Sequence, residues 1–162
     1  LAEPFEVTNV GSATELDEAL SEIKIFDALV MTAAVSDYRV ASPSNSKLKK
    51  TSMGEHATIE LIQNPDILKK VSSRSDRGIV VGFAAETLSN RVELEREAKD
   101  KLERKGCDLL VANDVSDGRT FDQDDNQVLI VSQSEATVSL GGSKKDIANA
   151  ILDRIVELTA SN

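Results

Sequence analysis

Short apolar runs alternate with longer amphipathic segments along most of this chain. Three of the runs have the length of a strand, and small or polar residues follow each of them: residues 28–35, 78–85 and 107–112. Apolar runs of this length that end in polar residues are typical of strands buried on both faces. We therefore predict three buried strands at the centre of a sheet.

Weaker strand patterns lie around these three. Residues 5–10 and 56–62 alternate between apolar and polar positions, which predicts two further strands. Residues 127–132 and 136–140 form a pair of such patterns around a short polar turn. The pair predicts a β-hairpin that adds an antiparallel edge to the sheet.

Segments with apolar residues at helical spacing lie between the predicted strands. The first follows Thr14, which together with Asp17 predicts an N-cap with an acidic third position, and it should end before Phe26. The second should begin at Asn64-Pro65, because Asn is a good cap and Pro suits the first helical position.

Two more helices complete the pattern. The longer spans residues 88–105 and should stop at Gly106, a residue type that often ends helices in the left-handed conformation. The last covers residues 144–158, capped by Ser143. Strands that alternate with helices predict a mostly parallel sheet. The fold class is therefore α/β: a three-layer, Rossmann-like, mostly parallel sheet with an added antiparallel β-hairpin, in a single domain of residues 1–162.

Composition narrows the classes of function. The net charge is -9 at pH 7, which argues against binding to nucleic acid or to an anionic membrane, because both need a basic surface. No apolar run approaches the roughly 18 residues of a membrane span. The single cysteine, Cys107, allows no disulfide within the chain, which fits a reducing cytoplasm. Because the chain begins with Leu1 rather than Met, we interpret it as a piece of a longer protein.

Residues 27–50 carry the first candidate site. The apolar strand ends just before Asp37, a loop of Ser, Pro and Asn follows, and then come Lys47, Lys49 and Lys50. Ligands of open α/β sheets bind outside the carboxyl ends of strands. A carboxylate and three lysines after such a strand predict a site for an anionic ligand. From these residues alone, a solvated surface loop is the simpler explanation of the lysines.

Four segments, in this order and spacing, resemble a known family. They are AAVSDYR with the downstream KLKK, then NPDIL, then VGFAAET, then KLERKGCDLLVANDVS with a later F-x-x-D-x-N. Together they are similar to the synthetase part of bacterial phosphopantothenoylcysteine synthetase, which is commonly fused to phosphopantothenoylcysteine decarboxylase in coenzyme A biosynthesis. The resemblance extends from about residue 5 to the end of the chain.

The resemblance implies a phosphopantothenate–cysteine ligase. Such enzymes condense 4′-phosphopantothenate with L-cysteine and usually consume CTP. The carboxylate attacks the α-phosphate to give 4′-phosphopantothenoyl-cytidylate and pyrophosphate, and the cysteine amine then displaces CMP. The resemblance also implies Mg²⁺ (or Mn²⁺) to offset the triphosphate charge, a cytoplasmic homodimer, and FMN only in an upstream decarboxylase domain, if one is present.

A set of site residues follows from the same resemblance. Lys47 matches the first lysine of the family's K-x-K-K motif and is the implied catalytic residue, which stabilises charge at the reacting phosphate. Asp37 would either hold the metal or contact the nucleotide. The implied nucleotide-binding residues are Met31, Thr32, Ala33, Asp37, Lys47, Asn64, Pro65, Asp66, Ile67, Phe83, Lys101 and Lys105. For Lys101 and Lys105, pairing with Glu97 on an exposed helix face is the simpler alternative.

Activity, assembly and the choice of nucleotide stay open at this point. The family's glycine- and serine-rich phosphate loop is absent from this sequence, so we do not expect full activity from these residues alone. The family completes its sites across a dimer interface, and residues 127–140 are the candidate contact, because an exposed hairpin edge needs a partner. An NAD(P)-dependent oxidoreductase is disfavoured because no G-x-G-x-x-G follows a strand. A non-catalytic nucleotide-binding module, and a ligase that uses ATP instead of CTP, both stay compatible with the sequence.

Overall fold

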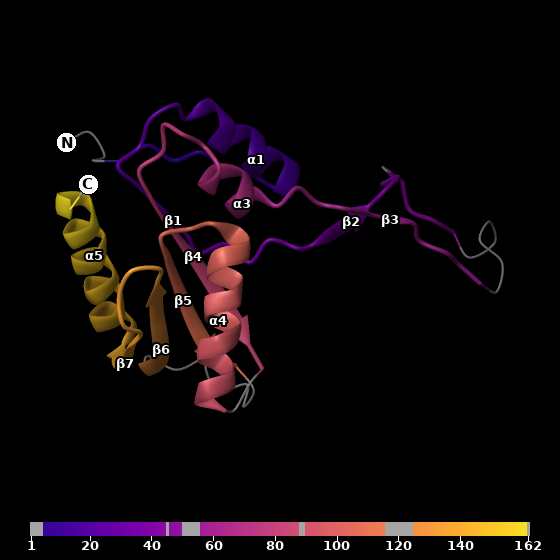
Figure 1. Cartoon of the computed structure of the whole chain (residues 1–162). Coiled ribbons are helices and arrows are strands. Elements are labelled where there is room, and N and C mark those ends of the chain that lie inside the picture. The colour runs from indigo at the N-terminus through magenta and orange to yellow at the C-terminus, as the bar shows by residue number, and fades with distance from the viewer. Residues whose placement is uncertain (1–4, 45, 50–55, 88–89, 116–124, 162) are drawn as a thin grey trace.

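A computed structural model describes residues 5–44, 46–49, 56–87, 90–115 and 125–161. Its centre is a five-stranded sheet in the order β1-β4-β5-β6-β7 (Figure 1). The strands are β1 (Ala28–Met31), β4 (Ile79–Glu86), β5 (Leu109–Asp114), β6 (Asp125–Ser132) and β7 (Val138–Ser143). β1, β4 and β5 are parallel, whereas β6 and β7 are antiparallel to their neighbours. The predicted mostly parallel sheet with an antiparallel hairpin is confirmed.

Helices cover both faces of this sheet and make three layers. They are α1 (Ala13–Glu22), α3 (Ile67–Ser72), α4 (Arg91–Lys105) and α5 (Lys144–Ser161). On the face of α1, α3 and α4, Ala98 and Leu102 pack in one cluster with Val80. On the opposite face, Ile151 of α5 packs in a second cluster with Val81. None of the helices in the described part of the chain is long and apolar enough to cross a membrane.

Two of the three strands that we predict as buried and central follow the prediction, but β1 does not. β1 lies at an edge of the described sheet, and its residues alternate between exposed and half-buried, with Val30 39% exposed. β4 and β5 begin and end within two residues of the prediction. β1 is shorter than predicted: it ends at Met31, which pairs with Gly82 of β4, instead of continuing to residue 35. Residues 33–35 leave the sheet and line a cavity. The two alanines among them are exposed and Val35 is half-buried, so the apolar run continues into a loop and not into a buried strand.

Residues 5–10 form no strand, and this prediction is wrong. Phe5 and Val7 are 65% and 64% exposed, and no described strand lies beside this segment. An alternating pattern is stable as a strand only where a neighbouring strand supplies hydrogen bonds and a core covers one face.

The strand predicted at residues 56–62 is shorter and lies outside the main sheet. β3 (Leu61–Gln63) pairs antiparallel with β2 (Tyr38–Val40), and the two form a separate sheet. Figure 1 shows that this pair projects away from the body of the molecule; we call the described residues 38–44, 46–49 and 56–63 the arm. The pattern at residues 56–62 is thus apolar on one face, but no layer in the described part of the chain covers that face, and Ile59 and Leu61 are exposed.

The N-cap of α1 differs from the predicted one. Ser12, not Thr14, is the cap: its Oγ accepts a hydrogen bond from the N–H of Glu15 (3.2 Å). Oε2 of Glu15 in turn accepts from the N–H of Gly11 (2.7 Å). The longer Glu side chain can reach back over the helix start, which gives a reciprocal arrangement like that of a capping box.

α3 begins two residues later than predicted. Asp66 is its N-cap, with Oδ1 accepting from the N–H of Lys69 (3.2 Å), so Pro65 precedes the helix instead of opening it. Asn64 is not a cap, and its side-chain Nδ2 donates to the carbonyl of Ser36 (2.8 Å). Because Asn and Asp are comparable caps, the local sequence does not rank them.

The predicted end of α4 and the predicted cap of α5 are confirmed, while α5 runs to Ser161, three residues beyond its predicted end. Gly106 ends α4 in the left-handed conformation, with a φ of 69°. Ser143 precedes α5, and its Oγ accepts from the N–H of Asp146 (3.2 Å). The predicted start of α4 at residue 88 falls outside the described residues, as does most of the acidic loop between β5 and β6.

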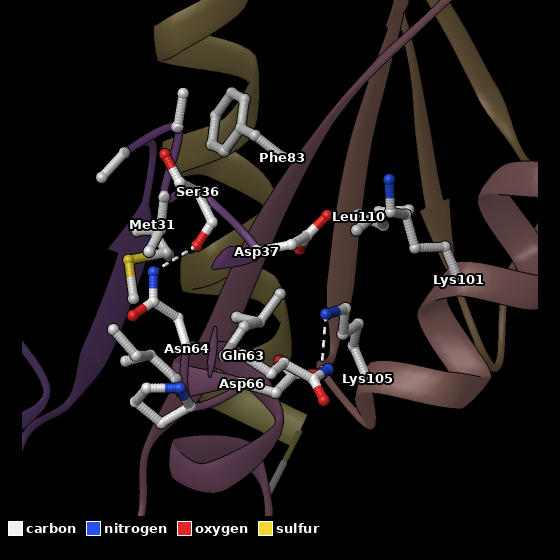
Figure 2. A pocket seen from close by; sticks show the side chains of 16 residues that line it. Met31, Ser36, Asp37, Gln63, Asn64, Asp66, Phe83, Lys101, Lys105 and Leu110 are labelled. Atoms are coloured by element: carbon white, nitrogen blue, oxygen red, sulfur yellow. Dashed lines mark hydrogen bonds and ion pairs between the residues drawn. The ribbon is translucent and has the colours of Figure 1, made fainter. Parts of the chain in front are cut away.

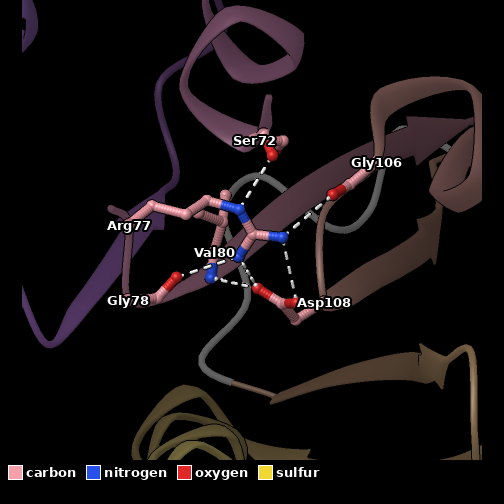
Figure 3. Close-up of polar contacts among 6 residues, drawn as sticks. All are labelled: Ser72, Arg77, Gly78, Val80, Gly106 and Asp108. Atoms are coloured by element: carbon pink, nitrogen blue, oxygen red, sulfur yellow. Dashed lines mark hydrogen bonds and ion pairs between the residues drawn. The ribbon is translucent and has the colours of Figure 1, made fainter. Parts of the chain in front are cut away.

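An arginine–aspartate pair ties the elements together at the amino ends of β4 and β5 (Figure 3). Arg77 donates to both carboxylate oxygens of Asp108. Its guanidinium also donates to the carbonyls of Ser72, Gly78 and Gly106. These bonds fix the C-terminal ends of α3 and α4 against the sheet.

Gly82 in β4 leaves room for α3 on the sheet. A Cβ at this position would lie 2.7 Å from Cδ2 of Leu68 and 3.0 Å from Cδ1 of Leu110. The absence of a side chain therefore allows α3 to approach β4 closely. This approach brings the start of α3 to the level at which β1 ends, because Met31 pairs with Gly82.

Candidate functional site

A cavity of about 340 Å³ opens at the carboxyl end of β1 (Figure 2). Two loops contribute to it: residues 33–37, which follow β1, and residues 63–66, which lead from β3 to α3. Phe83 of β4 and two lysines of α4, Lys101 and Lys105, also line it. The carboxyl end of a strand is the common ligand-binding position of open α/β sheets.

The structure brings ten of the twelve predicted nucleotide-binding residues to this cavity. They are Met31, Ala33, Asp37, Asn64, Pro65, Asp66, Ile67, Phe83, Lys101 and Lys105. Thr32 and Lys47 are not among the lining residues. Thr32 directly follows β1 and is exposed, whereas Lys47 lies on the arm after β2. The catalytic role of Lys47 therefore stays a prediction.

Hydrogen bonds hold the two loops of the cavity together. The N–H of Asn64 donates to the carbonyl of Asp37 (2.7 Å). The side-chain Nδ2 of Asn64 donates to the carbonyl of Ser36 (2.8 Å), as Figure 2 shows. Asn64 thus bonds to the opposite loop through both its backbone and its side chain.

Lys105 is paired with the cap residue of α3. Its Nζ donates to Oδ2 of Asp66 (2.7 Å), while Oδ1 of Asp66 accepts from the N–H of Lys69. Partial burial raises the pKa of Asp66, but the hydrogen bonds from Lys105 and Lys69 outweigh it, so this pKa lies below its ordinary value. Asp66 is therefore ionised at neutral pH and offsets the charge of Lys105.

Lys101 is paired with an acid that the sequence did not single out. Its Nζ lies 2.7 Å from Oε1 of Glu86, at the end of β4, and the two side chains are 26% and 21% exposed. The alternative of pairing with Glu97 is wrong for both cavity lysines, because Glu97 pairs with Arg104 (3.8 Å). The position of Glu86, directly after a buried apolar strand, was the sequence feature that could have pointed to it.

The cavity combines apolar side chains with two lysines, each of which is paired with a carboxylate. Met31, Ile67 and Phe83 contribute apolar surface. Lys101 and Lys105, one helical turn apart on α4, contribute two ammonium groups. Small-molecule sites commonly have this composition, with mostly apolar walls and a few polar groups that fix the ligand's orientation. The arrangement suits a ligand with a flat ring at one end and several negative charges at the other.

A second cavity, of about 380 Å³, adjoins the first. The two share the lining residues Ala34, Val35, Ser36 and Asn64. The second also includes Gly11 and Ser12 at the start of α1. Two ligands bound in these cavities would be neighbours across one loop.

No preformed metal centre is present in the described residues, since they contain no group of three or more His, Cys, Asp or Glu side chains that could hold an ion. Asp37 lines the cavity and is exposed. A Mg²⁺ ion that is bound mainly by phosphate oxygens and water needs only one or two protein carboxylates. Asp37 therefore fits a metal that arrives with a phosphate ligand.

Cys107 is a core residue, as predicted. It is 1% exposed and packs in the cluster under α3 and α4. Burial raises the pKa of its thiol to about 11, so the thiol is protonated at neutral pH. It behaves as a small apolar side chain.

Comparison with known proteins places these features in context. The family model for the DNA/pantothenate metabolism flavoprotein C-terminal domain matches residues 2–158. The Coenzyme A biosynthesis bifunctional protein CoaBC of Mycobacterium tuberculosis is 41% identical over 163 residues, which cover 96% of this chain and 39% of that protein. The CoaBC protein of Vibrio vulnificus is 42% identical over 154 residues, which cover 93% and 37%. The chain thus spans about two fifths of these relatives.

Solved structures show the same architecture. The crystal structure of the C-terminal domain of Coenzyme A biosynthesis bifunctional protein CoaBC aligns with a TM-score of 0.71 and 29% identity, covering 94% of this chain and 65% of that one. The DNA/pantothenate metabolism flavoprotein from Streptococcus pneumoniae aligns with a TM-score of 0.74 and 21% identity, covering 92% and 71%. At 21% identity the second likeness shows the fold alone.

Proposed function

Because the chain belongs to the family of the DNA/pantothenate metabolism flavoprotein C-terminal domain, we propose that it is the phosphopantothenate–cysteine ligase part of a cytoplasmic protein of coenzyme A biosynthesis. The proposal includes CTP as the co-substrate and 4′-phosphopantothenoyl-cytidylate as the intermediate. Its main support is the cavity at the end of β1, where ten of the residues implied for nucleotide binding come together from four parts of the chain.

The two sides of the cavity suggest how the nucleotide lies. The cytosine ring and ribose pack on the apolar side, against Phe83 and Ile67. The triphosphate extends toward Lys101 and Lys105, which leave their carboxylate partners for phosphate oxygens. The acyl substrate, 4′-phosphopantothenate, occupies the adjoining cavity, from which its carboxylate reaches the α-phosphate past the shared loop of residues 34–36.

A divalent ion, Mg²⁺ or Mn²⁺, would neutralise charge on the triphosphate and orient it for attack when bound. Asp37 is the residue that would hold this ion, because it lines the cavity and its carboxylate is exposed.

Lys47 supplies positive charge at the reacting phosphate and acyl group in this proposal. It lies on the arm and not in the cavity lining of its own chain. We therefore propose that the protein acts as a homodimer, in which the arm of one subunit closes over one of the dimer's two nucleotide cavities. The predicted contact, the hairpin of β6 and β7, presents β7 as an edge of the sheet. The arm is a second candidate contact, because Tyr38 and Leu61 are exposed on it.

Pyrophosphate release tests the proposal directly. The natural full-length protein is incubated with 4′-phosphopantothenate, L-cysteine, Mg²⁺ and either CTP or ATP. We expect pyrophosphate and CMP with CTP, in amounts equal to the amide formed, and little product with ATP. Omitting cysteine should leave a single turnover of pyrophosphate, because the acyl-cytidylate then accumulates.

Two outcomes would contradict parts of this proposal. Equal turnover with ATP would refute the choice of CTP and keep the ligase. Tight binding of NAD(P) in calorimetry, with no binding of CTP and no pyrophosphate release, would refute the ligase and favour an oxidoreductase on a similar sheet.

A further inference from the structure

Arg39 lies at the root of the arm, where the arm meets the cavity. It belongs to β2 and pairs in register with Ile62 of β3. Its Nη1 donates to the carbonyl of Gln63 (2.9 Å) and to Oδ1 of Asn64 (3.0 Å). Arg39 lines the adjoining cavity but not the main one, so it contacts a loop of the main cavity without lining that cavity.

Asn64 connects Arg39 to the loop of residues 33–37. Its Oδ1 accepts from Arg39, while its Nδ2 donates to the carbonyl of Ser36 (2.8 Å). Its backbone N–H donates to the carbonyl of Asp37 (2.7 Å). Arg39, Asn64 and the segment from Ser36 to Asp37 therefore form a continuous chain of hydrogen bonds between the arm and the two loops of the cavity.

The Arg39 guanidinium and the Ser36 carbonyl together select one orientation of the Asn64 amide. An Asn amide has nearly the same shape when its oxygen and nitrogen exchange places, so packing alone does not select one orientation. A guanidinium has donors and no acceptor. Only Oδ1 can therefore face Arg39, and Nδ2 is left to face the Ser36 carbonyl, which only accepts. Both neighbours therefore select the same orientation, and the amide is held at both of its ends. Without Arg39, only the bond to Ser36 would hold the side chain, and the amide would turn more freely.

We propose that Arg39 is a positioning residue of the nucleotide site, which orients the amide of Asn64 and thereby holds residues 33–37 and 63–66 at the spacing that the ligand requires. This inference rests on the proposed function, because it takes a nucleotide as the ligand of the cavity. Arg39 acts through Asn64 and not on the reacting atoms. The same bonds connect the root of the arm to the site.

The test compares CTP kinetics and amide exchange in the natural full-length protein and its variants. Arg39→Gln should raise the KM for CTP about tenfold, as expected for the loss of a hydrogen bond to a charged group, and should change kcat less than about threefold. Arg39→Lys should stay near the wild type, because an ammonium can donate to the same two acceptors. The double variant Arg39→Gln/Asn64→Ala should be no worse than Asn64→Ala alone, because the two residues act in series.

A second readout requires no ligand. The backbone amide of Asn64, which donates to Asp37, should exchange its hydrogen faster in Arg39→Gln than in the wild type. Arg96→Gln, at an exposed arginine of α4, serves as the matched control and should change neither KM nor exchange.

Three results would overturn the inference. The first is an unchanged KM for CTP in Arg39→Gln together with unchanged exchange at Asn64. The second is a double variant whose effects multiply, since Arg39 would then contact the ligand independently of Asn64. The third is an Arg39→Lys variant as impaired as Arg39→Gln. If the wild type does not bind CTP, the proposed function fails, and the exchange measurement still decides whether Arg39 orders the loops.

Discussion

The sheet body and the arm are built by different physical rules. In the body, Val80, Leu109 and Leu110 are 0% exposed and lie between layers of helices. In the arm, Tyr38 and Leu61 belong to a two-stranded pair and are 57% and 55% exposed. A two-stranded pair is marginal in water without further strands or a covering helix. The body therefore carries the stability of this chain, and the arm depends on contacts outside itself.

The difference also separates the proposed functional roles. The body supplies the fixed part of the site: the lysines of α4 and the end of β1. The arm carries Lys47, which no described contact brings to the cavity of its own chain. A rigid binding surface next to an extended segment is a common arrangement where closure completes a site. The following predictions test whether stability depends mainly on the body and whether the arm contributes to the chemistry.

Lys47→Gln in the full-length protein should cause the largest loss. We expect amide formation to fall about 10²–10³-fold, because the charge that this lysine offers to the reacting phosphate is lost. The melting temperature should stay within about one degree, since an exposed arm position contributes little to stability. Steady-state kinetics and thermal unfolding measure the two effects.

The control for this variant is Lys145→Gln, at an exposed lysine of α5. It makes the same change of charge on the body and should leave turnover unchanged. Turnover at the wild-type rate in Lys47→Gln would show that the lysines after β2 belong to a solvated loop and that the arm carries no chemistry.

A pair of Leu→Ala variants compares the stability of the two regions. Leu109→Ala in the body should lower the free energy of unfolding by about 2–5 kcal/mol, because it leaves a cavity in a closed core. Leu61→Ala in the arm removes the same atoms from a side chain that is 55% exposed and should cost less than about 0.5 kcal/mol. Urea unfolding at low protein concentration measures both.

The same pair also tests the proposed homodimer. If the arm is the contact, Leu61→Ala should shift the monomer–dimer equilibrium in analytical ultracentrifugation while leaving monomer stability unchanged. Equal destabilisation of the monomer by both variants would mean that the arm packs on the body, and the contrast between the regions would be lost.

Sequence patterns predicted the body much better than the arm. β4, β5 and α4 followed from long apolar runs, a long amphipathic segment and Gly106, because burial and local capping fix these elements. Residues 5–10 and 56–62 were misjudged, because alternation describes a strand but not its neighbours. In the same way, the apolar run that continues beyond β1 did not show the point at which the strand ends.

The prediction of the candidate site from the sequence was limited in the same way. Residues alone pointed to an anionic ligand near Asp37, and the resemblance to a family supplied the other positions. Neither source gave the partners: Glu86 for Lys101, or the contact of Arg39 with Asn64. These contacts join residues far apart in the chain, so no local spacing encodes them.

Glu86→Gln changes a residue of the body and should have a smaller effect, on the affinity for CTP. Its carboxylate oxygen lies 2.7 Å from Nζ of Lys101. A bound triphosphate has to compete with this carboxylate for the ammonium group. Removing the negative charge should therefore lower the dissociation constant of CTP about fivefold. This corresponds to about 1 kcal/mol, the usual upper range for a partly exposed ion pair. Lys101→Gln should weaken the binding of CTP instead. Calorimetry that finds weaker binding in Glu86→Gln would show that the ion pair persists in the complex and positions the lysine.

The smallest expected effect lies where the arm rejoins the body, at Asp66. The pKa of this carboxyl is lowered in the folded chain, so its contribution to stability is complete above its ordinary pKa of 3.8 and is lost as the pH falls through the lower folded value. Asp66→Asn keeps a good helix cap but removes the charge. The free energy of unfolding of the wild type should exceed that of the variant by at most about 1 kcal/mol at pH 6.

This difference should shrink as the pH is lowered toward 3, and urea unfolding at several pH values measures it. The same substitution in a Lys105→Gln background should show a smaller dependence on pH, because the hydrogen bond from Lys105 is one cause of the shift. A difference that grows at low pH would mean that the carboxyl is protonated in the folded chain. The junction would then lack the fixed negative charge that offsets Lys105, and the cavity would be more cationic before any ligand binds.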